Sequence, residues 1–574
     1  MRCADRRRPG PPAPDPPRRD APLRHPAFVA AALVAAACVA ISVSFALYDA
    51  DQWQNLAFGR AIWRLHDVPR TQLFAWPNYG ALLVNPSWGF TALVWPLWQW
   101  GGVPGLFVWR WATTLAAFAL LWAAARRMGA RGFAALPVLV LCALVYRQRS
   151  QIRPETLAAV WFALAVWLLE SARHGGRDRR WWLVAVMIAW VNTHVSFYLA
   201  PLLVGIHRLD AWRGRRPDAR VLDRVGVAML AAGFLNPYGW RTLVRPFQFA
   251  FAWRNEPIFR VISEIRTVDW SVNWANGLPL LVLAWPLLLA WRWRRAGLDR
   301  VELAMMIVFT ALGLASGRFI GTYALAAAPY VARDLAAWLE AWRAPALALR
   351  SLWARAALTG CLSVGACLYE WRHFEGPIAI AFDMRQTPER ACRFMAEHGI
   401  RGRGFNHFYV AGTMLWRFWP ERDRLPFMTG SPEDSPRELR AGYLAALQSA
   451  EGWRALDAQY HFDYALVSRR YLAGYGLIDL LDEDPGWARV FVDDVAAVYV
   501  RRDGPLAPVA AADGYRLLPG GRAHLDALLR RAVADSTVHA VLEVELDRQA
   551  REAQSNFYGR ALRRSLEAAA RGPR

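Results

Sequence analysis

Residues 27–53 read AFVAAALVAAACVAISVSFALYDADQW, an apolar run that ends in two aspartates one residue apart. The run 27–48 is too long for the core of a signal peptide and lacks a clear cleavage site, so it predicts a retained membrane span. Asp49 and Asp51 then stand at the outer membrane surface. There an aspartate either caps the amphipathic helix predicted at 52–65 or takes part in chemistry, and the sequence leaves both roles open.

Further apolar runs follow the first one at short intervals. Each is about long enough to cross a hydrocarbon core of roughly 30 Å at 1.5 Å per residue. Together they predict a polytopic α-helical membrane protein with about eleven transmembrane helices. The runs lie near 27–48, 104–125, 132–147, 155–172, 181–196, 197–212, 224–238, 276–292, 301–317, 319–335 and 352–371.

Arginine clusters between the runs predict the orientation. The chain has 69 basic residues against 47 acidic ones, a formal charge of +22, and the basic residues are all arginine. They recur in short loops rather than on one soluble face, which indicates positive-inside topology and argues against a nucleic-acid partner. We expect a disordered cytoplasmic tail at 1–26, a transmembrane domain at 27–372, and an outer first loop at 49–103.

The pattern changes after residue 376 to short apolar strands alternating with amphipathic helices, which predicts a soluble α/β domain at 376–504. An odd number of spans places this domain on the same side as the first loop. A charged helical extension at 512–574 follows, with a helical hairpin expected at 524–569. Strands are expected at 404–410, 425–428, 462–468, 489–492 and 495–500, and helices at 388–398, 436–448 and 471–481.

Three arginines lie on the predicted outer side, where the positive-inside rule disfavours them. They are Arg147, Arg149 and Arg153, in the segment that opens the run at 155–172. A guanidinium suits bidentate contact with phosphate, and it also suits snorkelling to lipid headgroups. The sequence alone does not separate these two roles.

Other polar residues near the outer face form a second candidate set. Asn192, His194 and Tyr198 fall at the predicted end of one span, and Arg318 stands in an outer turn. Polar residues at membrane depth are functional candidates, although hydrogen bonds between helices explain them equally well. The segment Asn236 to Trp240 is better explained as a span end with a proline stop and an interfacial aromatic.

The soluble domain shows one candidate ligand position. Asn406-His407-Phe408-Tyr409 and Gly412 follow a predicted strand and precede a helix, the usual place for a ligand at a sheet edge. A helix cap is the preferred explanation. The six cysteines are scattered without disulfide or metal spacing, so the sequence indicates no metal and leaves any need for a divalent cation open.

Residues 47–131 and 147–172 resemble the GT-C superfamily of membrane glycosyltransferases, which use polyprenyl-phosphate sugars. The superfamily includes protein O-mannosyltransferases and the aminoarabinose transferases of lipid A. Within the superfamily, the chain most resembles bacterial members with a periplasmic α/β tail. It is carried by the acidic pair at 49 and 51, Gly59-x-x-Ile62, the stretch around Trp88, Arg110, the segment Tyr146 to Glu155, and the motif Asn236-Pro237-Tyr238-Gly239-Trp240.

The resemblance implies inverting transfer of a sugar to an envelope glycan, lipid or protein at the periplasmic face of a bacterial inner membrane. It implies Asp51 as first choice for the base, with Asp49 second, and Arg147, Arg149 and Arg153 around the donor phosphate.

Two departures from the family pattern concern the first loop. Relatives often carry His where this chain has Asn55, and an Asp-His-Glu-Trp-like cluster where it has Asn85-Pro86-Ser87-Trp88. A scaffold or lipid-handling protein that kept the fold is therefore the main alternative. A transporter is less favoured, because the runs hold few charges and show no repeat of broken helices.

Overall fold

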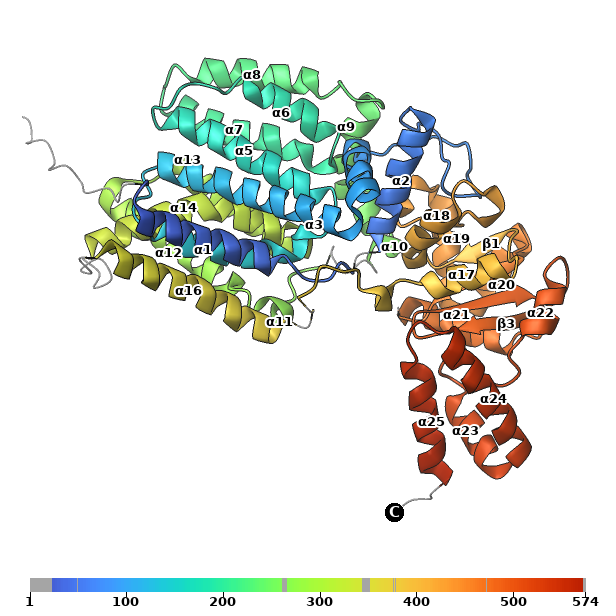
Figure 1. Ribbon diagram of the computed structural model, residues 1–574. Coiled ribbons are helices and arrows are strands. Elements are labelled where there is room, and N and C mark those ends of the chain that lie inside the picture. Colours follow the sequence, from blue (N-terminus) through green and yellow to red (C-terminus); the bar gives the residue numbers. More distant parts are fainter. Residues whose placement is uncertain are drawn as a thin grey trace, which may run out of the picture.

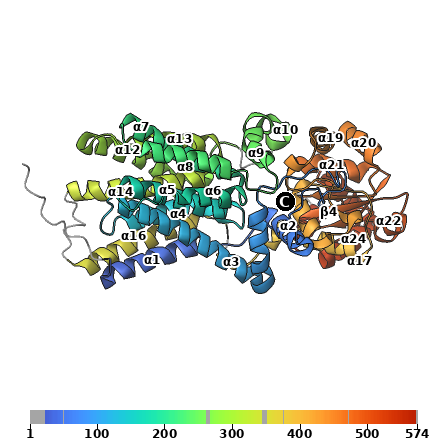
Figure 2. The same ribbon diagram turned by 90° about the horizontal axis from the view of Figure 1, so that it is seen from above.

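The computed structural model describes residues 23–48, 50–260, 266–342, 351–374, 376, 378–470 and 472–570. Most of the predicted cytoplasmic tail, and Asp49, therefore lie outside the described residues. The described chain forms a helical bundle and an α/β domain at one end of it (Figure 1). The same order along one axis is seen from above (Figure 2).

Every predicted apolar run overlaps a bundle helix. Of the described helices, only α3, α5 and α16 are long and apolar enough to cross a membrane by length and composition. The number of spans therefore stays a prediction. The bundle helices are α1 (Pro26–Ser42), α3 (Trp88–Arg127), α4 (Ala135–Tyr146), α5 (Glu155–Arg173), α6 (Trp182–Val191), α7 (Leu199–Arg213), α8 (Ala219–Ala232), α12 (Leu278–Ala296), α13 (Arg300–Ala315), α14 (Ile320–Ala341) and α16 (Leu352–His373).

Small residues let the bundle helices pack closely. Ala324, Ala326 and Ala328 of α14 are fully buried, as are Ala163 and Ala165 of α5. Alanine side chains allow backbones to approach, which is how helices associate where lipid supplies no hydrophobic drive. Together with larger side chains from α1, α3, α4 and α7, they form one continuous apolar core.

A buried ion network closes the end of the bundle that lies away from the soluble domain. Arg333 of α14 contacts Asp299 at 2.9 Å, and it also pairs with Glu302 and Asp334. Glu170 of α5 accepts hydrogen bonds from Tyr330 at 2.7 Å and contacts the His207 ring at 3.0 Å. Each buried charge therefore has a partner, as burial in a low-dielectric region requires.

The soluble domain has a four-stranded sheet in the order β1-β2-β4-β3, with β1 parallel to β2 and the other pairs antiparallel. Alternate residues of each strand face opposite sides. Thus Ala465 and Val467 of β2 pack under α19 and α21, while Tyr464 and Leu466 pack under α17 and α22. The strands are β1 (Gly404–Asn406), β2 (Tyr464–Ser468), β3 (Trp487–Val492) and β4 (Ala496–Arg501).

Helices cover both faces of this sheet, so the domain has three layers. The three helices predicted from the sequence are confirmed as α17, α19 and α21. The domain helices are α17 (Glu389–Glu397), α18 (Ala411–Phe418), α19 (Arg437–Gln448), α20 (Ala450–Tyr460), α21 (Leu472–Glu483), α22 (Ala507–Asp513), α23 (Leu525–Ala534), α24 (Ser536–Glu552) and α25 (Phe557–Ala570).

Three predictions about this domain are wrong. The strand expected at 404–410 ends at Asn406, and a 3-10 helix, η7 (Phe408–Val410), follows it. Residues 425–428 are not a strand: Asn406 Oδ1 accepts from the backbone N–H of Phe427 at 2.7 Å and of Met428 at 3.2 Å. A side chain thus replaces the expected strand ladder. The predicted terminal hairpin is instead three helices, α23, α24 and α25, because Asp535 caps a separate helix at Thr537.

Short elements lie between the bundle and the domain. The loop between α1 and α3 contains α2 (Asp51–Leu65), and the segment after α8 contains α9 (Trp240–Phe251), α10 (Pro257–Arg260) and α11 (Trp270–Asn273). Helix α2 was predicted to lie in the membrane interface. Instead it is packed between α3 and α18, because its apolar side chains Leu56, Ala57 and Ala61 are fully buried against protein.

Candidate functional site

Asp51 is the first residue of α2, and Ala50 is the N-cap. Asp51 therefore does not occupy the capping position that would explain it as a purely structural residue. A carboxylate in the first turn is still favoured by the helix dipole. Its side chain is 47 % exposed, so it remains accessible to a reactant.

Arg153 is the residue that the structure brings to Asp51. Its guanidinium lies 3.3 Å from the Asp51 carboxylate, and its side chain is 19 % exposed. Arg153 belongs to the turn between the short helix η1 (Arg147–Ser150) and α5. The loop between α1 and α3 and the arginine segment therefore meet, and they place a carboxylate and a cation in contact at the end of the bundle next to the soluble domain.

Arg110 holds these two segments in place. The side chain is fully buried in α3, with its guanidinium 3.9 Å from the centre of the Phe45 ring. It donates to the Phe45 carbonyl at 2.8 Å and to Ser150 Oγ at 3.0 Å. One side chain therefore ties the chain leaving α1 to the arginine segment.

The other two arginines of the segment point to different surroundings. Arg147 is 2 % exposed; its guanidinium pairs with Glu370 of α16 and lies 3.5 Å from the centre of the Phe374 ring. Arg149 crosses the first turn of α14, where a Cβ added at Gly321 would meet its Cγ at 2.9 Å. Arg147 is thus turned into the bundle, and Arg149 lies against the first turn of α14.

A second polar group surrounds His194. Its Nε2 lies 4.0 Å from Glu155 of the first turn of α5, while its Nδ1 accepts from the Ser196 N–H at 3.2 Å. Arg318 interacts electrostatically with the ring and lies 5.4 Å from the centre of Phe249. Glu155 follows Arg153 by two residues. The polar group around His194 therefore lies next to the pair of Asp51 and Arg153.

Asn192 and Tyr198 are the other two polar residues predicted at this end of the span, and Asn192 has a structural role. The Asn192 amide accepts from Trp88 Nε1 at 2.9 Å and donates to the carbonyls of Ile188 and Leu235, both at 2.8 Å. These bonds join α3, α6 and the end of α8. Tyr198 ends the short helix η2 (Val195–Tyr198), near Arg318.

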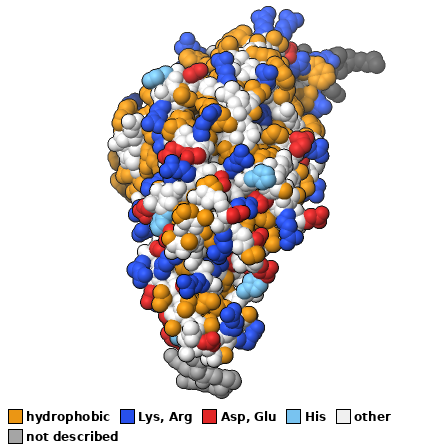
Figure 3. All heavy atoms as spheres, turned by 90° about the vertical axis from the view of Figure 1, so that its right-hand side faces the viewer, with side chains coloured by type: hydrophobic (Ala, Val, Ile, Leu, Met, Phe, Trp, Pro, Cys, Tyr) orange, Lys and Arg blue, Asp and Glu red, His pale blue; other side chains and the backbone are white. Residues whose placement is uncertain are grey.

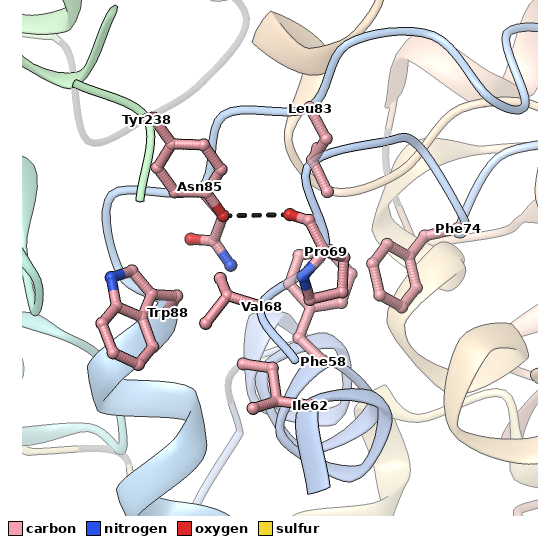
Figure 4. A pocket seen from close by; sticks show the side chains of 9 residues that line it. All are labelled: Phe58, Ile62, Val68, Pro69, Phe74, Leu83, Asn85, Trp88 and Tyr238. Atoms are coloured by element: carbon pink, nitrogen blue, oxygen red, sulfur yellow. Dashed lines mark hydrogen bonds between the residues drawn. The ribbon is translucent and has the colours of Figure 1, made fainter. Parts of the chain in front are cut away.

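The segment Asn236 to Trp240 forms a turn. Asn236 Oδ1 accepts from the Tyr238 N–H at 2.9 Å and from Thr242 Oγ1 at 2.8 Å. Tyr238 donates to the Pro69 carbonyl at 3.1 Å across a small hollow (Figure 4). The structural explanation of this motif is therefore supported by its contacts.

That hollow has about 200 Å³ of empty space, including the part that opens to solvent. Apart from Asn85 and the Tyr238 hydroxyl, its walls are apolar, and Figure 4 shows the side chains closing around it. It is lined by Phe58, Ile62, Val68, Pro69, Phe74, Leu83, Asn85, Trp88 and Tyr238. Its size and lining fit the packing of the first loop better than a sugar site.

In the soluble domain, the Asn406 side chain pins residues 427 and 428, as described above. His407 is fully buried, and burial lowers the pKa of its imidazole to about 3, so the ring is neutral. Gly412 of α18 faces α2: a Cβ there would meet the Ala50 carbonyl oxygen at 2.5 Å. These residues connect the domain internally and to the first loop.

Sequence reasoning missed the residues by which the soluble domain reaches the first turn of α2. Gln54 Oε1 accepts from the Gly430 N–H at 2.8 Å, and Gln54 Nε2 donates to Ser431 Oγ at 2.9 Å. The spacing of Asp51 and Gln54 places both on one helix face, which is a signal for Gln54. For Gly430 and Ser431 the sequence offers no such signal.

Among the described residues, no group of three or more His, Cys, Asp or Glu side chains has the arrangement to hold a metal ion. The face of the soluble domain that points away from the bundle mixes acidic, basic and apolar side chains (Figure 3). Next to the soluble domain, the end of the bundle presents a partly exposed pair of opposite charges, Asp51 and Arg153.

No protein-family model and no curated protein sequence matches the chain. Among solved structures, it superposes on the archaeal oligosaccharyltransferase AglB from Archaeoglobus fulgidus, in complex with an inhibitory peptide and a dolichol-phosphate. The TM-score is 0.56 at 12 % identity, over 80 % of this chain and 73 % of that one. The fold is a GT-C fold.

Two further structures show the range of this likeness. The apo form of the Archaeoglobus fulgidus oligosaccharyltransferase gives a TM-score of 0.52 at 13 % identity, over 82 % of this chain and 74 % of that one. ArnT from Cupriavidus metallidurans, bound to undecaprenyl phosphate, gives 0.48 at 16 % identity, over 82 % and 97 %. The GT-C fold expected from the sequence is confirmed by the two superpositions with TM-scores above 0.5.

Proposed function

We propose that this protein is a GT-C glycosyltransferase that moves a sugar from a polyprenyl-phosphate carrier to an acceptor hydroxyl, with inversion. The observation that carries the proposal is the contact between Asp51 and Arg153 at the outer end of a GT-C bundle. We further propose that the protein lies in a bacterial inner membrane with this end facing the periplasm. The acceptor is then an envelope glycan, lipid or protein.

Asp51 serves as the general base. Its carboxylate takes the proton of the acceptor hydroxyl while the hydroxyl oxygen attacks the anomeric carbon of the sugar. The bond between that carbon and the phosphate oxygen breaks, and the electron pair leaves with the lipid phosphate. Asp49 is the second candidate base, and it lies outside the described residues.

Cationic side chains stabilise the departing phosphate. Arg153 contacts Asp51 and can exchange this contact for a phosphate oxygen, since guanidinium forms bidentate bonds with either anion. Arg149 and Arg318 lie at the same end of the bundle and complete the cationic surroundings. Arg147 contributes indirectly, because its guanidinium already pairs with Glu370 and holds η1 against α16.

The scaffold alternative rests on a specific observation. The first loop has Asn85, Pro86 and Ser87 where relatives carry ionisable residues, and Asn85 Oδ1 accepts from the Ser87 N–H at 2.9 Å, as in an ordinary turn. A protein that kept the fold and lost the chemistry would show the same turn. Turnover distinguishes the two.

The experiment incubates purified protein with polyprenyl-phosphate-linked sugars and measures release of the lipid phosphate. Wild type is compared with Asp51→Asn and with a control, Asp67→Asn, which alters an exposed aspartate of the same loop. We expect Asp51→Asn to lower kcat by about 10² to 10⁴ and the control to be unaffected. Equal turnover in all three removes Asp51 as the base, and no turnover of wild type with any donor favours the scaffold.

A further inference from the structure

The soluble domain reaches the helix that carries the proposed base. Gln54 is 4 % exposed, and its amide group makes two hydrogen bonds across the interface, to the Gly430 N–H and to Ser431 Oγ. Gln54 follows Asp51 by three residues, so both side chains lie on one face of the first turn of α2. The domain therefore touches α2 beside the carboxylate.

Gly430 is in close contact with both side chains. A Cβ built on this residue would lie 3.1 Å from Gln54 Oε1 and 3.2 Å from Asp51 Oδ1. These distances are shorter than ordinary van der Waals contacts to carbon. Any larger residue would push on Gln54, on the Asp51 carboxylate, or on both.

The backbone before Asp51 is held by the segment that leads from α16 into the soluble domain. The Leu47 N–H donates to the Ala381 carbonyl at 2.9 Å, and the Asp383 N–H donates to the Leu47 carbonyl at 2.7 Å. Residues 378–383 lead from α16 into the soluble domain. The chain entering the first loop thus pairs with the chain entering the domain, which limits how far either one moves without the other.

We propose that Gln54, Gly430 and Ser431 form a clamp by which the C-terminal domain positions Asp51 for catalysis. The inference rests on the function proposed above and deepens it. Gln54 does not touch substrate and acts through the placement of the first turn of α2. The soluble domain is, on this account, a working part of the catalytic centre.

The buried amide of Gln54 explains why loss of this side chain should move the first turn of α2. Gln54 offers one acceptor and one donor, and the domain supplies a matching backbone N–H and a hydroxyl. Truncating the side chain leaves the Gly430 N–H without its acceptor in a largely buried contact, so the loop and the helix shift apart. A displacement of about 1 Å at a reacting group can lower a rate by about 10².

The first test measures transfer by Gln54→Ala and Gly430→Ala. We expect kcat to fall about 10-fold to 100-fold, with the KM for the donor changed less than about threefold, because the phosphate-binding arginines stay in place. The control is Gly365→Ala, where an added Cβ meets no described atom within 4 Å. Wild-type kcat in both test variants would overturn the proposal.

The second test uses Gln54→Glu. A glutamate keeps the acceptor for the Gly430 N–H and replaces the amide donor by a second acceptor, to which the Ser431 hydroxyl can donate. We therefore expect kcat at high pH to recover to within about threefold of wild type. Its charge near Asp51 raises the pKa of the base, so the acid limb of the pH–rate profile should move up by about 0.5 unit. A profile identical to that of Gln54→Ala would show that Gln54 has only a packing role.

A variant of Arg60 distinguishes positioning of Asp51 from general docking of the soluble domain on α2. Arg60 lies about 9 Å further along α2 than Gln54 and donates to the α18 carbonyls of Leu415 and Trp416 at 3.2 and 2.9 Å. Arg60→Ala should weaken docking of the domain while lowering kcat less than Gln54→Ala does. An equal loss of kcat in the two variants would overturn the clamp.

Amide hydrogen exchange reports on the clamp without any substrate. Gln54→Ala should speed exchange at residues 51–55 at least 10-fold, and Arg60→Ala should act at residues 411–419 instead. Unchanged exchange at residues 51–55 in Gln54→Ala contradicts the clamp. If exchange changes as expected but wild type turns over no donor, the clamp stands and the proposed function fails.

Discussion

Asp434 is a buried carboxyl group at the junction of the soluble domain and α9, and its pKa is raised there. It lies in the short helix η9 (Pro432–Asp434) of the soluble domain, 3.5 Å from Arg245 of α9. Burial, and then the neighbouring Glu433 carboxylate, raise the pKa of Asp434 to about 7, and Arg245 acts against them. Its proton is therefore bound more tightly in the folded protein than in the unfolded chain.

This predicts a pH-dependent stability with a definite sign. An unfolded aspartate has a pKa near 3.9, so the folded state binds the extra proton between about pH 4 and pH 7. The contribution of Asp434 is complete below this window and is lost as the pH rises through it. Asp434→Asn should therefore unfold at a higher temperature than wild type at pH 8 and at about the same temperature at pH 4.

Thermal unfolding across this pH range is the measurement. Asp423→Asn is the control, because the side chain of Asp423 is 48 % exposed and that variant should follow the wild-type curve. An Asp434→Asn variant that is less stable than wild type at pH 8 would show that the charged pair with Arg245 outweighs burial.

At the scale of the element, the crossing of α2 and α3 depends on a glycine. A Cβ at Gly59 would lie 2.3 Å from the Thr91 carbonyl oxygen and 2.8 Å from the Trp95 Cβ. The first of these atoms is backbone and cannot turn away. Gly59 thus lets α2 lie directly on α3, and this contact fixes the side of α2 that is free to meet α18.

Gly59→Ala should therefore force α2 away from α3. We expect the free energy of unfolding to fall by about 1–3 kcal/mol, the usual cost of overpacking a close contact. Gly205→Ala in α7 is the matched control: an added Cβ there has no described atom within 4 Å, so helix propensity should make it neutral or slightly stabilising. Denaturant titration measures both, and equal stabilities would mean that α2 is not held by this crossing.

At the scale of the whole molecule, the segment after α8 holds the domain against the bundle. Arg440 of α19 forms a bidentate pair with Glu256, both contacts at 2.8 Å, and its side chain is 6 % exposed. Ile258 and Phe259 of α10 enter the core of the domain. An ion pair and an apolar contact therefore attach the same short segment, residues 256–259, to the soluble domain.

Arg440→Ala should weaken this attachment by about 3 kcal/mol, because it leaves the Glu256 carboxylate without its partner in a partly buried contact. Limited proteolysis should then cut the variant faster than wild type between bundle and domain. Arg208→Ala is the control, since Arg208 and Asp223 form an exposed pair, which contributes less than about 1 kcal/mol. Equal cleavage of both variants would show that the apolar contacts suffice.

The sequence by itself determined only part of the helices, since an apolar run or a clear helical period is a local property of the chain. The runs in the bundle, α2 and the helices α17, α19 and α21 were predicted because their residues specify them without reference to distant segments. The strand expected at 425–428 was wrong because the side chain of Asn406, about twenty residues away, satisfies its backbone.

Only the tertiary structure decided which polar residues meet. Asp51, Arg149 and Arg153 were candidates from the sequence, but the contact of Asp51 with Arg153 depends on how α2 and α5 pack. Arg147 has the same side chain as Arg153 and is buried against Glu370. The bonds of Gln54 to Gly430 and Ser431 join residues more than 370 positions apart, and no local pattern encodes such a pairing.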